Sequence, residues 1–257
     1  MTRRDDIERI ETGLDEALKT LAPFTPGRVA TEFKTGTDPV TAADLAVDAV
    51  LRELLPRNGE GWLSEETADD DARLSCDRVW IVDPIDGTRE FVQGIPEWCV
   101  SIGLIEGGQP VAGGIVNPAT GERIVGSTAT GVRYDGDRWA VHASRLRGAV
   151  VLASRSEYRR GEWERFTDQG FAVVPMGSVA FKLALVAAGR ADATWTLVPK
   201  HEWDVAAGAA LLTAAGGWIA RPDGGRVPWN QRSPLLDGFV ATTATIAAET
   251  ARLLEMD

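Results

Sequence analysis

The stretch Val79-Trp80-Ile81-Val82-Asp83-Pro84-Ile85-Asp86-Gly87-Thr88 decides the interpretation of this 257-residue chain. Its first four residues are wholly apolar, which is typical of a strand buried on both faces. The strand leads directly into two aspartates, three positions apart across a proline-containing turn. This spacing at a strand end can aim both carboxylates to one side. The stretch therefore predicts a buried strand that delivers Asp83 and Asp86 to a common site.

Asp83 and Asp86 are typical ligands of a hard cation. Mg²⁺ prefers oxygen ligands, commonly one or two carboxylates together with water and substrate phosphate. The Ile85 carbonyl offers another oxygen, Gly87 allows close approach of the backbone, and Thr88 adds a hydroxyl where a helix start would bind an anion. Taken alone, the segment is better explained as a turn whose aspartates bond their own backbone. The surrounding sequence has to decide between the two interpretations.

Helical and strand periodicities surround this stretch. Apolar residues recur at helical spacing over residues 5–22, which predicts an amphipathic helix. Thr41 followed by Asp44 is typical of an N-cap with an acidic third residue, and predicts a second helix that ends at Pro56. We expect strands at 98–105, 111–116, 122–126 and 138–142, of which the first two form a hairpin.

The pattern alternates between strand and helix after about residue 146. A mostly antiparallel sheet preceded by two helices, and then this alternation, predict an α+β half over residues 1–145 and an α/β half over residues 146–257. The first half would carry Asp44, Glu65 and the aspartate pair, and the second half Asp204. The expected strands of the second half are 149–153, 171–174, 191–197 and 238–243, and the expected helices are 160–168, 178–188, 204–215 and 244–255.

The composition limits the partners of the chain. Its formal net charge is −11, and residues 60–90 alone hold ten acids and three bases. This acid excess argues against a nucleic-acid polymer or an anionic membrane as the main partner, because the summed field repels both. The acidic run 69–71 is expected to be a solvated loop. The sequence shows no apolar signal core and no stretch long enough to span a bilayer, which predicts a cytoplasmic protein without membrane insertion. Cys76 and Cys99 are too few for a disulfide framework and are expected to be packing residues.

Three further acids accompany the aspartate pair. Glu65 and Glu66 lie upstream, and Asp204 opens a run of small residues that is typical of a tightly packed helix. Taken singly, the glutamates are typical of solvated residues and Asp204 of a helix cap. Together with Asp83 and Asp86 they form a recognisable set.

This set resembles the inositol monophosphatase superfamily of metal-dependent, lithium-sensitive phosphomonoesterases. Four separated segments match in the expected order, namely 38–44, 64–66, 80–88 and 203–208. The third segment is highly specific. The resemblance implies a layered αβαβα fold, two or three Mg²⁺ ions per site, and a homodimer.

The resemblance also assigns metal ligands. Glu65, Asp83 and the Ile85 carbonyl would hold the first metal, and Asp83, Asp86 and Asp204 the second. Elementary electrostatics agrees, because clustered carboxylates repel both one another and a phosphate until divalent cations reverse the sign of the site. Such cations also lower the pKa of a bound water for in-line attack, so no side-chain nucleophile is needed.

The same resemblance implies the catalytic and substrate contacts. Asp44 would hydrogen-bond to Thr88, and Thr88 with Glu65 would orient and activate the attacking water. The small anionic phosphomonoester substrate would be contacted by Asp86, Gly87, Thr88, Ser178, Lys182 and Asp204.

Two features favour the bacterial 3′(2′),5′-bisphosphate nucleotidases, the CysQ-like branch. The sequence after Gly87, Thr88-Arg-Glu-Phe91, is similar to that branch. Ser178 and Lys182 resemble its Gly-Ser-x-x-Lys stretch, although this chain has one extra residue between them. Leu197 stands where inositol phosphatases commonly carry a glutamate. The substrate implied is adenosine 3′,5′-bisphosphate, hydrolysed at the 3′-phosphate to AMP and phosphate.

Other interpretations stay open at this point. The substrate could instead be inositol 1-phosphate, fructose 1,6-bisphosphate or histidinol phosphate. A member of a different class, an inactive module that binds metal or phosphate, would keep the same fold. Lys182 is as well explained by snorkelling from an amphipathic helix as by a phosphate contact. A surface salt bridge explains Arg155 better than a substrate contact does.

Overall fold

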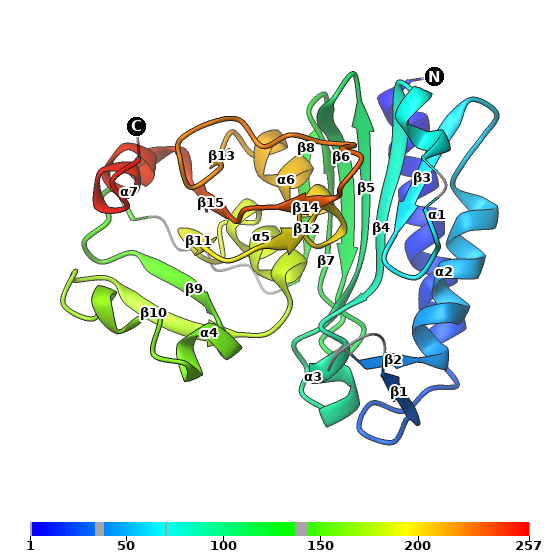
Figure 1. The fold of residues 1–257 in the computed structure, drawn as a ribbon, viewed down its shortest axis with the longest axis horizontal. Helices are drawn as coiled ribbons and strands as arrows, with labels where there is room; N and C mark the ends of the chain where they lie inside the picture. Colours follow the sequence, from blue (N-terminus) through cyan, green and yellow to red (C-terminus); the bar gives the residue numbers. More distant parts are fainter. Residues whose placement is uncertain (1, 34–38, 70, 137–142, 257) are drawn as a thin grey trace.

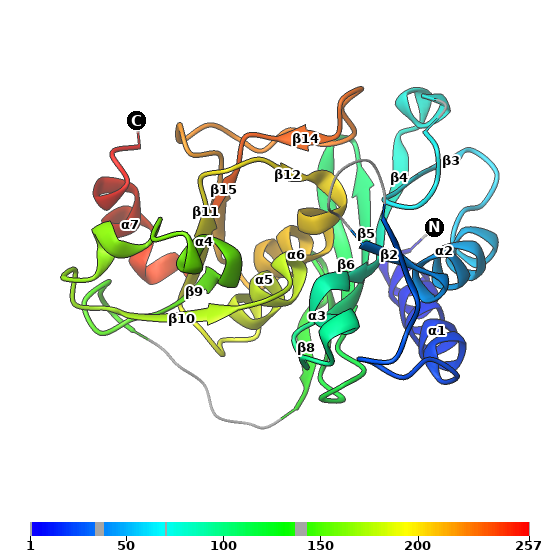
Figure 2. The same cartoon turned by 60° about the horizontal axis from the view of Figure 1, so that its bottom comes forward.

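Among the described residues, the two larger β-sheets alternate with three layers of helices (Figure 1). The computed structural model describes residues 2–33, 39–69, 71–136 and 143–256. Figures 1 and 2 both show α5 and α6 between the two sheets, and α1 with α2 on the far face of the larger sheet. This arrangement confirms the αβαβα layers that were expected. No helix among the described residues combines the length and the apolarity that a membrane crossing requires.

The larger sheet contains the stretch that opened the sequence analysis. Within the described residues its strand order is β3-β4-β5-β6-β7-β8, with β3 parallel to β4 and every other neighbour antiparallel. Strand β4 is buried from its second residue to its end, as its apolar run predicts. The strands are β3 (Glu60–Ser64), β4 (Arg78–Asp86), β5 (Cys99–Glu106), β6 (Gln109–Val116), β7 (Arg123–Ser127) and β8 (Gly131–Asp135).

Helices α1 (Arg3–Leu21) and α2 (Ala42–Leu54) cover the outer face of this sheet. Both begin with a capping box, at Thr2 and Thr41, in which the third helical residue is an aspartate. Their buried stripes belong to one apolar cluster with the outward side chains of β4 and β5. The two N-terminal helices were predicted correctly, because a cap and a stop flank each periodic run.

Helices α5 (Val179–Ala187) and α6 (Glu202–Ala214) fill the layer between the sheets. Helix α6 lies directly on β5 and β6, where Gly103 and Gly113 leave room for its backbone. A Cβ on Gly103 would lie 2.8 Å from the Ala207 nitrogen, and one on Gly113 would lie 2.5 Å from the Ala207 carbonyl oxygen. The small residues after Asp204 therefore serve a close helix-to-sheet contact, which fixes the N-terminus of α6 beside the end of β4.

The second sheet has the order β10-β9-β11-β15-β13 among the described residues. Its outer face packs against an aromatic cluster that includes Trp163, Phe166 and Trp195, beneath α4 and α7. The elements here are β9 (Val150–Ser154), α4 (Arg155–Arg159), β10 (Ala172–Met176), β11 (Ala193–Thr196), β13 (Trp218–Ala220), β15 (Phe239–Thr242) and α7 (Ala247–Leu253).

The helix expected at 160–168 is wrong. Helix α4 ends at Arg159, and the segment continues as a turn before the single 3₁₀ turn η2 (Glu164–Phe166). Gly161 has φ +79°, in the left-handed region, and this interrupts the helix. The strand expected at 138–142 lies outside the described residues. The division into halves at residue 145 stays a prediction.

Short elements escaped prediction because they carry too few residues for a periodic pattern. The Asp-Pro-Ile-Asp segment itself is the end of β4, and α3 follows it immediately. These elements are β1 (Thr31–Phe33), β2 (Pro39–Thr41), η1 (Ala72–Ser75), α3 (Thr88–Gln93), β12 (Lys200–His201) and β14 (Leu235–Leu236). The 3₁₀ turn η3 (Ala244–Ile246) begins the helix expected at 244–255.

Glu60 joins α1 to the larger sheet from a buried position. Its side chain is 2% exposed. One carboxylate oxygen accepts hydrogen bonds from Arg9 at 3.1 Å and Arg78 at 3.0 Å, and the other accepts one from the Trp80 indole at 2.9 Å. Burial opposes ionisation, yet these donors together lower the pKa of Glu60 to about 2.

Replacement of Glu60 should therefore destabilise the fold. We expect Glu60→Gln to lower the free energy of unfolding by about 3 kcal/mol, because it removes the buried negative charge that the Arg9 and Arg78 guanidinium groups share. The control is Glu8→Gln, whose pair with Arg4 is exposed; it should cost less than about 0.5 kcal/mol. Equal costs in urea denaturation at pH 7 would contradict the account.

The wild type and Glu60→Gln also provide a test by pH. The pKa of Glu60 in the folded state, about 2, lies below its ordinary value of 4.5. The stability that its charge contributes is therefore complete above pH 4.5 and is lost as the pH falls through 2. We expect the difference between the wild type and Glu60→Gln to shrink over this window, and a constant difference would count against the assignment.

Candidate functional site

The end of β4 and the start of α3 form the floor of a cavity. Asp83 and Asp86 are 1% and 7% exposed, and both line it together with Ile85, Gly87 and Thr88. The pairing of β4 with β5 is irregular between the two aspartates, so both carboxylates can reach the cavity. The Ile85 amide donates a hydrogen bond of 3.0 Å to Asp83. The predicted convergence of this pair is thus present in the structure.

Strand pairing brings Glu65 to the same point. Ser64 lies opposite Val82 in the parallel pair of β3 and β4, so the next residues, Glu65 and Asp83, are neighbours. Asp204 arrives from the first turn of α6, held by a 2.9 Å hydrogen bond from the His201 amide. One carboxylate oxygen of each of Glu65, Asp83 and Asp204 lies within 4.8 Å of the other two. Three segments far apart in sequence therefore bring oxygen ligands to one point.

The electrostatics of this cluster call for a cation. Burial raises the pKa of Asp83 well above its usual range, and the charges of Glu65, Asp86 and Asp204 raise it further. Burial likewise raises the pKa of Asp204, with Asp86 and Glu65 contributing. Carboxylates that repel one another in a cavity, and that offer only oxygen, match the preference of a hard divalent cation. The donor set therefore fits Mg²⁺.

Asp44 and Thr88 meet beside the cluster, as expected. Asp44 accepts hydrogen bonds from the amide and the hydroxyl of Thr41, at 2.8 and 2.6 Å. Its other oxygen lies 3.2 Å from the Thr88 hydroxyl, which is also 2.9 Å from the Ile85 carbonyl oxygen. Burial raises the pKa of Asp44 despite these donors. Asp38, in the same sequence segment, lies outside the described residues.

Ser178 supports Asp86 from the opposite side of the cavity. Its hydroxyl donates to Asp86 at 2.6 Å and accepts from the Phe181 amide at 3.0 Å, and so caps α5. The Ala180 amide donates to the same Asp86 oxygen at 2.5 Å. Ser178 has φ +56°, which is costly for a residue with a side chain. The hydroxyl is therefore held in a strained position where it serves both the helix and the carboxylate.

Lys182 lies one helical turn beyond Ser178 and is only 3% exposed, which excludes the snorkelling interpretation. Its ammonium donates to the carbonyl oxygens of Ser178 at 2.6 Å and of Met176 and Gly177 at 3.4 Å. Burial lowers its pKa to about 8, although the charge of Asp86 acts in the opposite direction. Lys182 thus supplies a buried positive charge beneath the turn that bears Ser178.

Two further cations, Arg155 at the start of α4 and Lys200 on β12, line the same cavity. Arg155 forms an ion pair with Glu97, which confirms the salt-bridge interpretation, and Lys200 lies 3.6 Å from Glu157. Glu97 also accepts a 2.7 Å hydrogen bond from the Gly177 amide. The sequence analysis missed Glu97 and Lys200. The available signal for Lys200 was its position just before the helix that carries Asp204.

Comparison with known proteins identifies the family of the chain. The profile of the inositol monophosphatase family matches residues 8–255. The chain belongs to the inositol monophosphatase family. It is therefore a member of a family of metal-dependent phosphatases, and by family a phosphoric monoester hydrolase.

Two curated relatives of this chain are named after different substrates. An inositol-1-monophosphatase of Rhizobium meliloti is 34% identical over 201 residues, which cover 74% of this chain and 75% of that protein. A 3′-phosphoadenosine 5′-phosphate phosphatase of Mycobacterium leprae is 36% identical over 218 residues, covering 80% and 78%. The crystal structure of the suhB protein from Bartonella henselae has a TM-score of 0.81 at 28% identity, covering 98% of both chains.

Two substitutions test whether the backbone of Ser178 is strained. Ser178→Ala should lower the free energy of unfolding by about 2 kcal/mol, because it removes both a helix cap and a hydrogen bond to a buried carboxylate. Ser178→Gly removes the same hydroxyl but relieves the positive φ, so it should be about 1 kcal/mol more stable than Ser178→Ala. Urea denaturation in a chelator measures both. A glycine variant less stable than the alanine variant would refute the strain.

Proposed function

We propose that this chain is a Mg²⁺-dependent phosphomonoesterase that removes the 3′-phosphate of adenosine 3′,5′-bisphosphate. The observation that carries the proposal is the charge distribution of one cavity. Among the described residues that line it are five acids and four bases, with a formal net charge of −1. Two Mg²⁺ ions would convert this to +3. Such a cavity suits a substrate with two phosphate groups better than a polyol with one.

Arg155 begins α4, Lys200 lies on β12 and Arg89 lies in the first turn of α3. Arg155 pairs with Glu97, and Lys200 lies 3.6 Å from Glu157. A substrate whose scissile phosphate lies at Asp83 and Asp86 would place its second phosphate near these bases, in competition with the two glutamates. Leu197, at the position where inositol phosphatases commonly carry a glutamate, is 37% exposed and offers no hydrogen bond to a sugar hydroxyl.

The metal ligands proposed are those of the carboxylate cluster. Glu65, Asp83 and the Ile85 carbonyl would hold one ion, and Asp83, Asp86 and Asp204 a second. Bound Mg²⁺ supplies charge neutralisation at the phosphate and lowers the pKa of a water molecule.

The chain's own groups would orient the reactants. Asp44 accepts a hydrogen bond from the Thr88 hydroxyl, so the Thr88 oxygen can in turn accept a hydrogen bond from the attacking water. Glu65 accepts the other hydrogen bond of that water and activates it. The backbone at Gly87 and Thr88, at the start of α3, contacts the phosphate oxygens. The carboxylates of Asp86 and Asp204 contact the substrate from the opposite side of the cavity.

Hydrolysis of inositol 1-phosphate is the second candidate. It is favoured by the relative from Rhizobium meliloti, which is named an inositol-1-monophosphatase and matches 74% of this chain, against 80% for the mycobacterial phosphatase. The two candidates share the carboxylate cluster and differ in what the cationic side of the cavity contacts.

A phosphate-release panel separates these candidates. With Mg²⁺, kcat/KM should be highest for adenosine 3′,5′-bisphosphate, by about tenfold or more over inositol 1-phosphate, fructose 1,6-bisphosphate and histidinol phosphate. Asp86→Asn should abolish turnover and retain a cooperative unfolding transition. A higher kcat/KM for inositol 1-phosphate would overturn the substrate assignment. Release from none of the four, with Mg²⁺ still bound, would favour the inactive binding module.

A further inference from the structure

Arg73 lies between the two segments that carry Glu65 and Asp204. We propose that Arg73 is a positioning residue that fixes the loop after β3 against the first turn of α6. The inference rests on the proposed function, because it assigns a role to these two acids in metal binding. It concerns how their relative position is held, which the carboxylate cluster itself does not explain.

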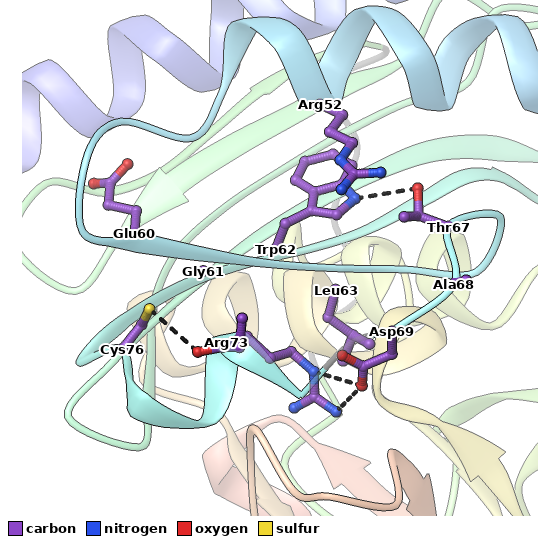
Figure 3. Close-up of a pocket in the computed structure, with 11 residues that line it drawn as sticks. Arg52, Glu60, Gly61, Trp62, Leu63, Thr67, Ala68, Asp69, Arg73 and Cys76 are labelled. Carbon is purple, nitrogen blue, oxygen red and sulfur yellow. Dashed lines mark hydrogen bonds and ion pairs between the residues drawn. The ribbon is translucent and has the colours of Figure 1, made fainter.

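The Arg73 guanidinium donates hydrogen bonds to two different segments of the chain. Its side chain is 1% exposed, which is rare for an arginine that is not paired. One edge donates to an Asp69 oxygen, at 2.9 Å from Nε and 2.5 Å from Nη2. The other edge donates to the Asn230 side-chain oxygen at 2.6 Å and to the Gln231 carbonyl at 2.9 Å. Figure 3 shows the Arg73 guanidinium directed at Asp69.

Asp69 is therefore a bound residue. Asp69 is exposed, as expected for a solvated loop, and it also pairs with Arg73, while Asp71 forms an ion pair with Arg232 at the surface. Both described aspartates of the run, Asp69 and Asp71, therefore have basic partners. Those bases lie close in sequence for Asp69 and 161 positions away for Asp71.

The contact continues from the 230–231 turn into α6. Both oxygens of Glu202, the first residue of α6, accept backbone amide hydrogen bonds, from Asn230 at 2.7 Å and from Gln231 at 2.8 Å. Glu202 is fully buried. The Asn230 side-chain amide donates back to the Arg73 carbonyl at 3.1 Å. Arg73 is thus joined through one short turn to the helical turn that carries Asp204.

The loop is also fixed at its other end. The hydroxyls of Ser64 and Thr67, on either side of Glu65, both donate to the carboxylate of Asp48 on α2. Gly61 on β3 allows the helical turn η1 to lie close, because a Cβ there would be 2.8 Å from the Arg73 Cβ. Figure 3 shows this face of the loop, where Thr67 contacts the Trp62 indole above Arg73.

The link from Arg73 to α6 is short, so its loss is expected to affect the metal ligands. Glu65 and Asp204 would hold two neighbouring ions that share the ligand Asp83. Displacement of either acid would therefore weaken ion binding at the cluster. Partners that orient ligands in this way typically change metal affinity by about 10- to 100-fold when they are removed. Arginine suits the position, because only its planar fork can serve Asp69 and the 230–231 turn together.

The test uses Arg73→Lys, which keeps the charge and loses the fork, together with Arg73→Met. We expect each to weaken Mg²⁺ binding about tenfold or more, measured by calorimetry on the full chain. We also expect faster amide hydrogen exchange at residues 66–69. The matched control is Arg232→Met, because Arg232 and Asp71 join the same two loops with side chains 75% and 41% exposed. It should leave both quantities unchanged.

A second variant covers the case in which Arg73→Met does not fold. Asp69→Asn removes the partner carboxylate from the solvent side and should produce the same two changes. Unchanged exchange and Mg²⁺ affinity in Arg73→Lys and Asp69→Asn would overturn the proposal. Amide exchange is measured without Mg²⁺ or substrate, so its result does not depend on the phosphate-release panel. A chain that releases no phosphate but shows faster exchange would refute the proposed function alone.

Discussion

Repulsion among buried carboxylates is the constraint on which this structure depends. Asp83, Asp86 and Asp204, with Glu65 beside them, share one cavity, and burial raises the pKa of each of the three aspartates. Natural folds retain such a cluster where it serves a function, because each ionised group costs stability in the absence of a partner. The architecture can be understood as a means of holding these groups together until a cation neutralises them.

Helix N-termini offset part of that repulsion. Helices α2, α5 and α6 all begin at the site, and the positive end of each peptide dipole favours a nearby carboxylate. Asp44 and Asp204 each occupy the third position of their helix and accept a backbone amide at the cap, whereas Asp86 accepts the Ala180 amide of α5. The helices between the sheets therefore also stabilise the carboxylates of the site.

The sequence allowed prediction of what is local or periodic. The strand that ends at Asp83, the capped helix at Thr41 and the close-packed helix at Asp204 each have a short signature. Arg73, Asn230 and Glu202 escaped prediction, because the contacts of Arg73 with the 230–231 turn join positions more than 150 residues apart. Gly161, with its positive φ, lies within the helix expected at 160–168, of which only the 3₁₀ turn η2 forms. The folded structure, rather than the sequence, shows that Lys182 and Asp69 are held by hydrogen bonds to other residues.

The most direct test of the central claim is the stability of Asp83→Asn with and without Mg²⁺. The asparagine oxygen can still accept from the Ile85 amide, so the substitution removes chiefly a buried charge. In a chelator the melting temperature of the variant should exceed that of the wild type. With Mg²⁺ at 100 times its Kd, the wild type should gain about 2.7 kcal/mol and become the more stable. A variant that is less stable than the wild type in the chelator, or that gains equally from Mg²⁺, would contradict the account.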